Sequence, residues 1–169
     1  PGRGLTDAGR AFVRRAGELG LIFDISHMSD RAVYDLLSLT DRPVLATHSD
    51  YRAVTDVPRN LPGDIAREVA HRGGVIGLNL YPPFLDQTHA GTDAVLRHLS
   101  YGLELCGEDA VGFGLDIDGT DGEYPEGITD GRSIHDQLLE LLFAAFPARI
   151  AEKIAGGNVL HFLAKTLPE

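Results

Sequence analysis

The sequence predicts an α/β fold built on a parallel sheet, and two observations carry this prediction. Short apolar runs alternate with stretches of helical periodicity, and the runs lie at residues 21–26, 43–47, 74–81 and 110–118. None of them alternates apolar with polar residues, which is typical of parallel strands covered on both faces. The strand–helix alternation favours a parallel sheet with helical crossovers. Four such strands fit either a small doubly wound sheet or half of an eight-stranded barrel, whose whole form has about 250 residues.

Helix signals fill the segments between these runs. Thr6 is a candidate N-cap for a helix over residues 5–20, and Ser29 is a candidate N-cap for a helix over residues 30–39. Later segments with helical spacing lie at residues 61–74, 93–107, 133–146, 147–157 and 158–167. A loop is expected from Gly119 to about Arg132.

The composition of the 169 residues fits one globular domain. A net charge of −10 argues against nucleic acid and against an anionic membrane surface as partners, because both attract clustered Lys and Arg. We expect neither a membrane segment nor a signal peptide in this chain, because no apolar run approaches the ~20 residues that span a bilayer. The single cysteine, Cys106, excludes an internal disulfide and leaves the compartment open. Because the first residue is Pro1 rather than Met, we expect a processed product, a trimmed chain or a piece of a longer one.

Polar side chains follow every predicted strand, close to the point where the strand ends. In chain order they are Asp24 and His27, then His48, then Asn79 and Tyr81, then Asp116 and Asp118. The carboxyl ends of parallel strands meet at one edge of the sheet, where sites in α/β folds are built. Neutral imidazole binds zinc well, and a carboxylate can orient or deprotonate a zinc-bound water. The set therefore suits a metal-assisted hydrolase.

Structural alternatives stand beside these functional interpretations. A single histidine after a strand is more often a capping or core residue than a ligand, but two at the same offset on neighbouring strands make a ligand pair about as plausible. Asp24 is expected to hold a loop, with orientation of an imidazole as its functional alternative. Arg59 is either a solvated loop residue or a bidentate partner for a carboxylate. Cys106 is expected to be a buried, inert thiol. The remaining histidines are expected in the core or at the surface: His71, His89, His98, His135 and His161.

Together these motifs resemble the membrane (renal) dipeptidase family, the M19 group of zinc peptidases with amidohydrolase-like barrels. The matching segments are GLTDAGRAFVRRAGELGLIFDISHMS, RPVLATHSDYRAV, PRNLPGDI, GGVIGLNLYPPFL and VGFGLDIDGTDGEYPEGITD. They cover nearly the whole chain in the order and spacing of the family. The resemblance implies a metal-dependent-hydrolase type (β/α)8 TIM barrel, of which this chain is the C-terminal half, its last four strand–helix units. Residues 1–169 would then form a single partial domain.

The resemblance also implies roles for individual residues. His27 and His48 match the two histidines that bind one of the family's paired zinc ions. Arg59 matches the arginine that binds the substrate carboxylate. Asp116 matches the aspartate that contacts the substrate and handles the proton passed to the leaving amine.

The resemblance further implies a dipeptide substrate, contacted less strongly by Asn79 and Tyr81. The family cleaves dipeptides, tolerates D-residues at the C-terminal position, and in some members opens β-lactams. The implied mechanism is attack on the peptide carbonyl by a hydroxide that bridges two zinc ions, which typically lie about 3.5–4 Å apart. Family members include membrane-anchored secreted forms and bacterial cytoplasmic ones, and the cytoplasmic location is favoured here.

The chain departs from the family pattern by starting midway through it. The first-strand His-x-Asp pair, the bridging glutamate and a further histidine of the family have no counterpart here. Two histidines are few ligands for zinc, which normally takes at least three protein ligands, so we expect the isolated chain to bind metal weakly and to be inactive.

A half-barrel leaves two sheet edges and an apolar inner face open, which favours association. We expect the N-terminal half as a separate polypeptide or as part of a longer chain, with self-assembly into a homo-oligomer as the third explanation. Two other functions remain: another amidohydrolase-type hydrolase, which would not be expected to carry PRNLP and DIDG, and a degenerate barrel module without catalysis. The preferred dipeptide is left open.

Overall fold

A four-stranded parallel sheet forms the centre of the molecule, as the apolar runs predict. The computed structural model describes residues 2–120, 122–129 and 133–167. The strands lie side by side in chain order and are β1 (Phe23–Asp24), β2 (Val44–Ala46), β3 (Val75–Leu78) and β4 (Val111–Phe113). Every neighbouring pair is parallel. The chain therefore winds in one direction, strand then helix, without reversing its order.

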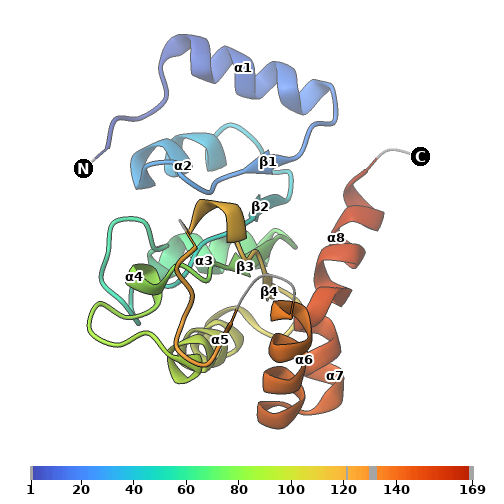
Figure 1. The fold of residues 1–169 in the computed structure, drawn as a ribbon. Coiled ribbons are helices and arrows are strands. Elements are labelled where there is room, and N and C mark those ends of the chain that lie inside the picture. The colour runs from blue at the N-terminus through green and yellow to red at the C-terminus, as the bar shows by residue number, and fades with distance from the viewer. Residues whose placement is uncertain (1, 121, 130–132, 168–169) are drawn as a thin grey trace.

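Helices connect and flank these strands (Figure 1). The helices before and between the strands are α1 (Asp7–Glu18), α2 (Asp30–Leu37), α3 (Gly63–His71), α4 (Pro82–Leu85) and α5 (Thr92–Cys106). After β4 come a 3₁₀ turn, η1 (Ile117–Gly119), then α6 (Ile134–Ala145), α7 (Ala148–Glu152), a π-helical turn, η2 (Lys153–Gly157), and α8 (Asn158–Thr166). Figure 1 shows α1 and α2 beside the first strand and α6 to α8 beside the last one.

The two predicted N-caps are confirmed. The Thr6 hydroxyl accepts a hydrogen bond from the backbone N–H of Gly9, and the Ser29 hydroxyl accepts one from Ala32. Each hydroxyl satisfies an N–H group that has no partner inside its own helix. The caps thus fix where α1 and α2 begin, and the start of α2 in turn fixes the short loop after β1.

Some elements differ from the prediction. The strands are shorter than their apolar runs, although single backbone hydrogen bonds continue past the strand ends, such as those from Ser49 to Gly77 and from Leu80 to Leu115. The segment between β3 and α5, for which the sequence predicts no element, contains α4, which starts at Pro82, a residue that is well suited to the first turn of a helix. The predicted helix over residues 147–157 changes to a π turn at Lys153. The predicted loop after Gly119 includes residues 121 and 130–132, which lie outside the described part of the chain.

The two faces of the sheet differ in burial. Phe23, Val44 and Ile76 lie on one face and are almost fully buried against the helices. The opposite face begins with Asp24, which is exposed, and Leu45, which is half-buried. Paired residues of neighbouring parallel strands point to the same side, so the second face is partly open at β1 and β2. This differs from the expectation of two covered faces and fits the inner side of a half-barrel.

Large apolar side chains remain exposed at both ends of the sheet. Phe12 of α1, Leu19 directly after it and Leu21 before β1 are 66%, 58% and 50% exposed, and at the other end Leu160 of α8 is 70% exposed. Within the described residues the sheet ends at β1 and β4, whose outer edges face no further strand. A search of the described helices for one long and apolar enough to cross a bilayer finds none.

Candidate metal centre

Three predicted site residues meet at the carboxyl edge of the sheet. His27 follows β1, His48 follows β2 and Asp116 follows β4, and one ligand atom of each lies within 4.8 Å of the others. The Nε2 atoms of His27 and His48 are 2.9 Å apart, and His48 Nε2 is 4.0 Å from Asp116 Oδ2. Two imidazoles and one carboxylate therefore converge on one point, although the first and the last lie 89 positions apart in the sequence.

Two of these residues have an unusual backbone. Among the described residues, the non-glycine residues with positive φ are His27, at 67°, and Asp116, at 55°. This left-handed conformation costs a non-glycine residue roughly 1–3 kcal/mol and collects at functional sites. Both turns direct a side chain toward the cluster shortly after a strand ends. The strain therefore coincides with the candidate metal centre.

The Asp116 carboxylate is held by its neighbours. Asn79 Nδ2 donates a hydrogen bond to Asp116 Oδ2 at 3.1 Å, and Asn79 Oδ1 accepts one from the backbone N–H of Tyr81 at 2.6 Å. Asn79 is completely buried, so its amide faces these protein groups. A Cβ atom on Gly119 would collide with the Asp116 carboxylate. The predicted site residues Asn79 and Tyr81 thus lie at the same edge, Asn79 in direct contact with Asp116.

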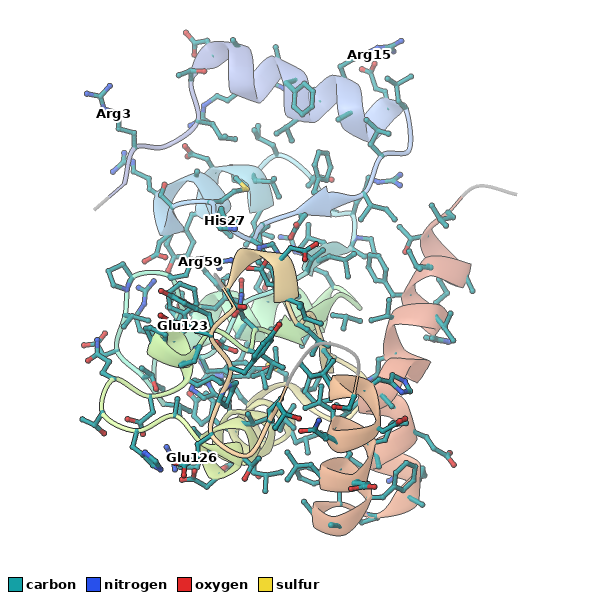
Figure 2. The ribbon with its side chains drawn as sticks, in the orientation of Figure 1. Arg3, Arg15, His27, Arg59, Glu123 and Glu126 are labelled. Atoms are coloured by element: carbon teal, nitrogen blue, oxygen red, sulfur yellow. The ribbon has the colours of Figure 1, made fainter. Side chains whose placement is uncertain are left out.

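Arg59 reaches the same edge from the loop after β2. Its Nη1 donates to Ser49 Oγ at 3.0 Å and its Nη2 donates to the backbone carbonyl of His48 at 2.8 Å. The guanidinium carbon lies 5.7 Å from the centre of the Phe84 ring, within reach of a cation–π interaction. Figure 2 shows Arg59 and His27 on the same side of the sheet, next to η1. Burial lowers the pKa of Arg59, and the nearby carboxylate of Asp50 opposes this effect.

Local electrostatics favour a neutral His48 and an ionised Asp24. Burial lowers the pKa of His48, an effect partly opposed by the Asp116 carboxylate. Burial raises the pKa of Asp24, but hydrogen bonds from Thr47 and Ser26 outweigh it and hold that pKa below its ordinary value. A neutral imidazole is the form that binds a metal ion.

Sequence reasoning missed several residues that support the site. Thr47 and Ser49 flank His48 and hydrogen-bond to Asp24 and Arg59 respectively. Asp50 is fully buried, which raises the pKa of its carboxyl well above the ordinary value, and it accepts a hydrogen bond from the backbone N–H of Asn79 at 3.0 Å. The sequence marks them only as members of the polar run directly after β2, which does not indicate what each residue contacts.

His98 lies in the core, one of its two expected positions, whereas Cys106, expected to be buried, is half-buried. His98 is completely buried in α5 and has a pKa of about 4, because burial disfavours its charged form. Burial likewise raises the pKa of the half-buried Cys106 thiol to about 11. Neither residue belongs to the cluster around His48. We therefore assign both residues to the packing of the protein rather than to the site.

The donor set fits a zinc ion of the kind that catalytic sites hold. Such sites commonly use three protein ligands from His and carboxylates and keep one position open. His27 and His48 supply two donors of these chemical types, and the Asp116 carboxylate lies in the same cluster. The half-exposed setting of the cluster leaves room for a ligand that comes from outside the chain.

Parallel strands with these donors at their carboxyl edge define a half-barrel α/β protein with a candidate metal centre. A sequence model of the membrane dipeptidase family, peptidase family M19, matches residues 1–167. The chain belongs to this family. The fold class is confirmed as well: it is the C-terminal half of the family's barrel, with all four strands parallel.

Individual relatives agree with this assignment. The chain is 33% identical to an uncharacterised dipeptidase of Schizosaccharomyces pombe, over 94% of this chain and 39% of that protein. It is 32% identical to the dipeptidase aclJ of Aspergillus oryzae, over 95% of this chain and 38% of that protein. A crystal structure of a metallo peptidase from Rhodobacter sphaeroides, liganded with a phosphinate mimic of the dipeptide L-Ala-D-Ala, matches with a TM-score of 0.90 and 32% identity. That match covers 98% of this chain and 48% of the other one. The chain thus spans half or less of the length of these relatives.

Proposed function

We propose that this chain supplies the C-terminal half of the catalytic domain of a zinc-dependent dipeptidase. The observation that carries the proposal is the convergence of His27, His48 and Asp116, whose ligand atoms lie within 4.8 Å of one another at the carboxyl edge of a family M19 sheet. A structural role alone gives no reason for two imidazoles to face each other there. The chain by itself provides part of the site.

In this proposal the complete site holds two zinc ions, and His27 and His48 bind one of them. Zinc would polarise the scissile carbonyl and make an attacking water more acidic. His48 is suited to this role because burial keeps its pKa low and its imidazole neutral. His27 lies beside it on a separate strand end, so that both rings face the same point.

Asp116 is assigned the proton that passes to the leaving amine. Its Oδ2 lies between His48 and the Asn79 amide, at 4.0 and 3.1 Å, so the carboxylate faces both the metal position and a fixed donor. Asn79 orients this carboxylate by hydrogen bonding. A fixed orientation matters because proton transfer requires the acid within hydrogen-bond reach of its partner.

Arg59 is assigned the carboxylate of the dipeptide. Its guanidinium carries five N–H donors. Two of them bind Ser49 and the His48 carbonyl, and these contacts hold the positive charge at the edge of the site. Tyr81 stands beside Asn79 and is proposed as a further substrate contact. The ligand of the Rhodobacter relative, a mimic of L-Ala-D-Ala, supports a dipeptide with a D-residue at its C-terminal position as the substrate class.

The missing half of the barrel is proposed as the partner of this chain, either as a separate segment or as part of a longer polypeptide. The open edges of β1 and β4 could each pair with a further strand, which would close the sheet. Exposed apolar side chains such as Phe12 and Leu160 lie at the two ends where that half would pack. The same half would supply the ligands that complete the second zinc position.

Two measurements on purified material test the proposal. Intact mass together with zinc content shows whether a second fragment accompanies this chain and how many ions the sample carries. Hydrolysis of Gly-D-Ala and L-Ala-D-Ala is then followed with and without added zinc. We expect no hydrolysis by the pure 169-residue chain and zinc-dependent hydrolysis when the other half of the barrel is present. An assembled particle that contains the other half with its ligands, yet neither binds zinc nor cleaves dipeptides, would favour a degenerate binding module instead.

A further inference from the structure

A chain of hydrogen bonds runs from the open face of the sheet to the imidazole of His48. Asp24 Oδ2 lies 2.6 Å from Thr47 Oγ1, and the same Thr47 oxygen lies 2.7 Å from His48 Nδ1. Asp24 belongs to β1, whereas Thr47 and His48 follow β2, so the chain crosses from one strand to the next. It ends on the ring nitrogen opposite the one that faces His27.

Counting donors fixes the direction of these bonds. The second oxygen of Asp24, Oδ1, accepts from the backbone N–H groups of Thr47 and Ser26, both at 3.0 Å. An ionised carboxylate has no proton to donate, so Oδ2 must accept a hydrogen bond as well. The Thr47 hydroxyl has a single proton, and directing it to Oδ2 makes Asp24 the acceptor of three hydrogen bonds. The Thr47 oxygen is then left as an acceptor, and His48 Nδ1 must be the donor.

We propose that Asp24 and the Thr47 hydroxyl form a positioning pair that holds His48 in its Nδ1–H tautomer. His48 then presents an unprotonated Nε2 to the metal position. Neither residue contacts the ion or the substrate. A partner on the second ring nitrogen fixes both the tautomer and the orientation of a ligating histidine, and a carboxylate usually provides it directly. Here a hydroxyl stands between the carboxylate and the ring. The inference rests on the proposed metal-binding role of His48.

The surroundings of Thr47 restrict its movement. The backbone of His48 is held by Ser26, whose Oγ accepts from the His48 N–H at 3.0 Å. On the other side, the Thr47 carbonyl packs against Gly77 and Gly114, where an added Cβ atom would collide with it. A β-branched side chain on a fixed backbone has few rotamers available. The backbone that carries the hydroxyl is thus fixed, and the exposed hydroxyl itself is held by its contacts with Asp24 and His48.

The geometry on the other side of the ring agrees with this tautomer. His48 Nε2 is 2.9 Å from His27 Nε2 and 4.0 Å from Asp116 Oδ2. An unprotonated His48 Nε2 accepts a hydrogen bond from His27 in the metal-free protein. The same lone pair is available to an ion once His27 no longer donates to it.

The first test reads the tautomer directly and requires no metal and no activity. Long-range ¹H–¹⁵N correlation spectra of the metal-free, ¹⁵N-labelled chain at about pH 7.5, above the ordinary histidine pKa of about 6.5, distinguish the protonated ring nitrogen from the unprotonated one. The His48 signals are identified by their loss in His48→Gln. We expect Nδ1 of His48 to carry the proton. A proton on Nε2 in the native protein would overturn the inference.

The second test uses a matched pair of variants. Thr47→Val keeps the size and branching of the side chain but removes the hydroxyl, whereas Thr47→Ser keeps the hydroxyl. We expect Thr47→Val to shift His48 toward the Nε2–H tautomer and to weaken zinc binding about 10- to 100-fold, a typical effect of losing such a partner. Thr47→Ser should retain the native tautomer and a zinc affinity within about threefold of native. The same result is expected for the control Thr40→Val, because the Thr40 hydroxyl contacts the backbone N–H of Arg42, away from the site.

The outcomes separate this inference from the proposed function. If Thr47→Val leaves both the tautomer and the zinc affinity unchanged, the hydroxyl does not position His48 and the inference fails. If the native chain binds no zinc, alone or together with the other half of the barrel, while His48 shows the Nδ1–H tautomer that depends on Thr47, the pair positions the ring and the metal-binding role is wrong. Unfolding of Thr47→Val is detected in the same spectra, and the native tautomer and the Thr47→Ser result then decide the question.

Discussion

Arg59 donates a hydrogen bond from Nη2 to the backbone carbonyl of His48, 2.8 Å away. The side chain proposed to bind the substrate carboxylate is therefore attached to the backbone of a proposed metal ligand. One hydrogen bond thus links the proposed substrate-binding residue to the proposed metal ligand. A change in either residue should affect the position of the other.

Replacement of Arg59 by lysine tests this connection. Lysine keeps the positive charge but cannot reach Ser49 Oγ and the His48 carbonyl together, because it lacks the planar fork of arginine. We expect Arg59→Lys to lower the free energy of unfolding by about 1–3 kcal/mol. Urea unfolding measures this. Arg15→Lys, which changes an exposed ion pair with Glu18, should stay within about 0.5 kcal/mol of native, and equal effects of the two variants would contradict the argument.

The two histidines should contribute jointly to zinc binding. His27→Ala and His48→Ala each remove one donor from the cluster, so each should weaken zinc binding by more than the 10- to 100-fold typical of a lost supporting partner. Competition with a chromogenic chelator measures the affinity. The control is His135→Ala, whose side chain is 77% exposed and lies in α6. A loss of the same size in the control would mean that zinc binds to surface histidines rather than to the cluster.

Asp116 offers a test that separates charge from backbone strain. Asparagine adopts the left-handed conformation readily, so Asp116→Asn should keep the turn at φ 55° and the overall stability while it removes the negative charge. Zinc affinity should fall while the urea midpoint remains close to native. Asp116→Ala should lose about 1 kcal/mol of stability as well, because alanine bears the strain without local hydrogen bonding. Equal stability of the two variants would show that the turn carries no such strain.

Gly119 should matter through the space it leaves for the Asp116 carboxylate. Gly119→Ala places a Cβ atom against that carboxylate, and we expect a loss of about 1–3 kcal/mol together with weaker zinc binding. Gly17→Ala is the matched control, since its Cβ would meet only the Arg42 side chain at 3.9 Å and alanine favours the helix. Gly17→Ala should be neutral or stabilising. An unaffected zinc affinity in Gly119→Ala would argue against a fixed position for Asp116.

His98 should make the stability of the chain depend on pH. Its pKa is about 4 in the folded protein and about 6.5 when unfolded, so the unfolded chain takes up the proton first as the pH falls. The contribution is complete above pH 6.5 and is lost as the pH falls toward 4, amounting to about 2 kcal/mol between pH 6.5 and 5. Urea unfolding in the presence of a chelator measures this slope. In His98→Gln, whose amide can still donate to the Leu85 carbonyl, the slope should decrease, and an unchanged slope would assign it to other groups.

The sequence sufficed for the fold and for the convergence of the main site residues. Continuous apolar runs report burial on both faces, and parallel strands bring their carboxyl ends to one edge, so His27, His48 and Asp116 could be placed together before any coordinates. The residue roles that rest on the family resemblance remain predictions. The openness of one sheet face at Asp24 was not visible in the local pattern, because it depends on a half of the barrel that this chain does not contain.

The supporting contacts could not be predicted, for a physical reason. Whether Asp24 only holds a loop or also orients an imidazole depends on the rotamer of Thr47, a residue with no distinctive sequence signal. The structure shows the contacts on which both interpretations depend: the carboxylate accepts from the Ser26 N–H in its own turn and from the Thr47 hydroxyl next to His48. Hydrogen bonds between neighbouring strands depend on register, and register is fixed by the whole sheet.

The left-handed backbone at His27 and Asp116 has a consequence for laboratory evolution. A screen that selects only for resistance to heat would reward replacement of these two residues by glycine, which adopts positive φ without cost. Each such substitution would raise the thermal stability of the half-barrel and remove one donor from the cluster. Selection for robustness and selection for metal binding would therefore pull the same two codons in opposite directions.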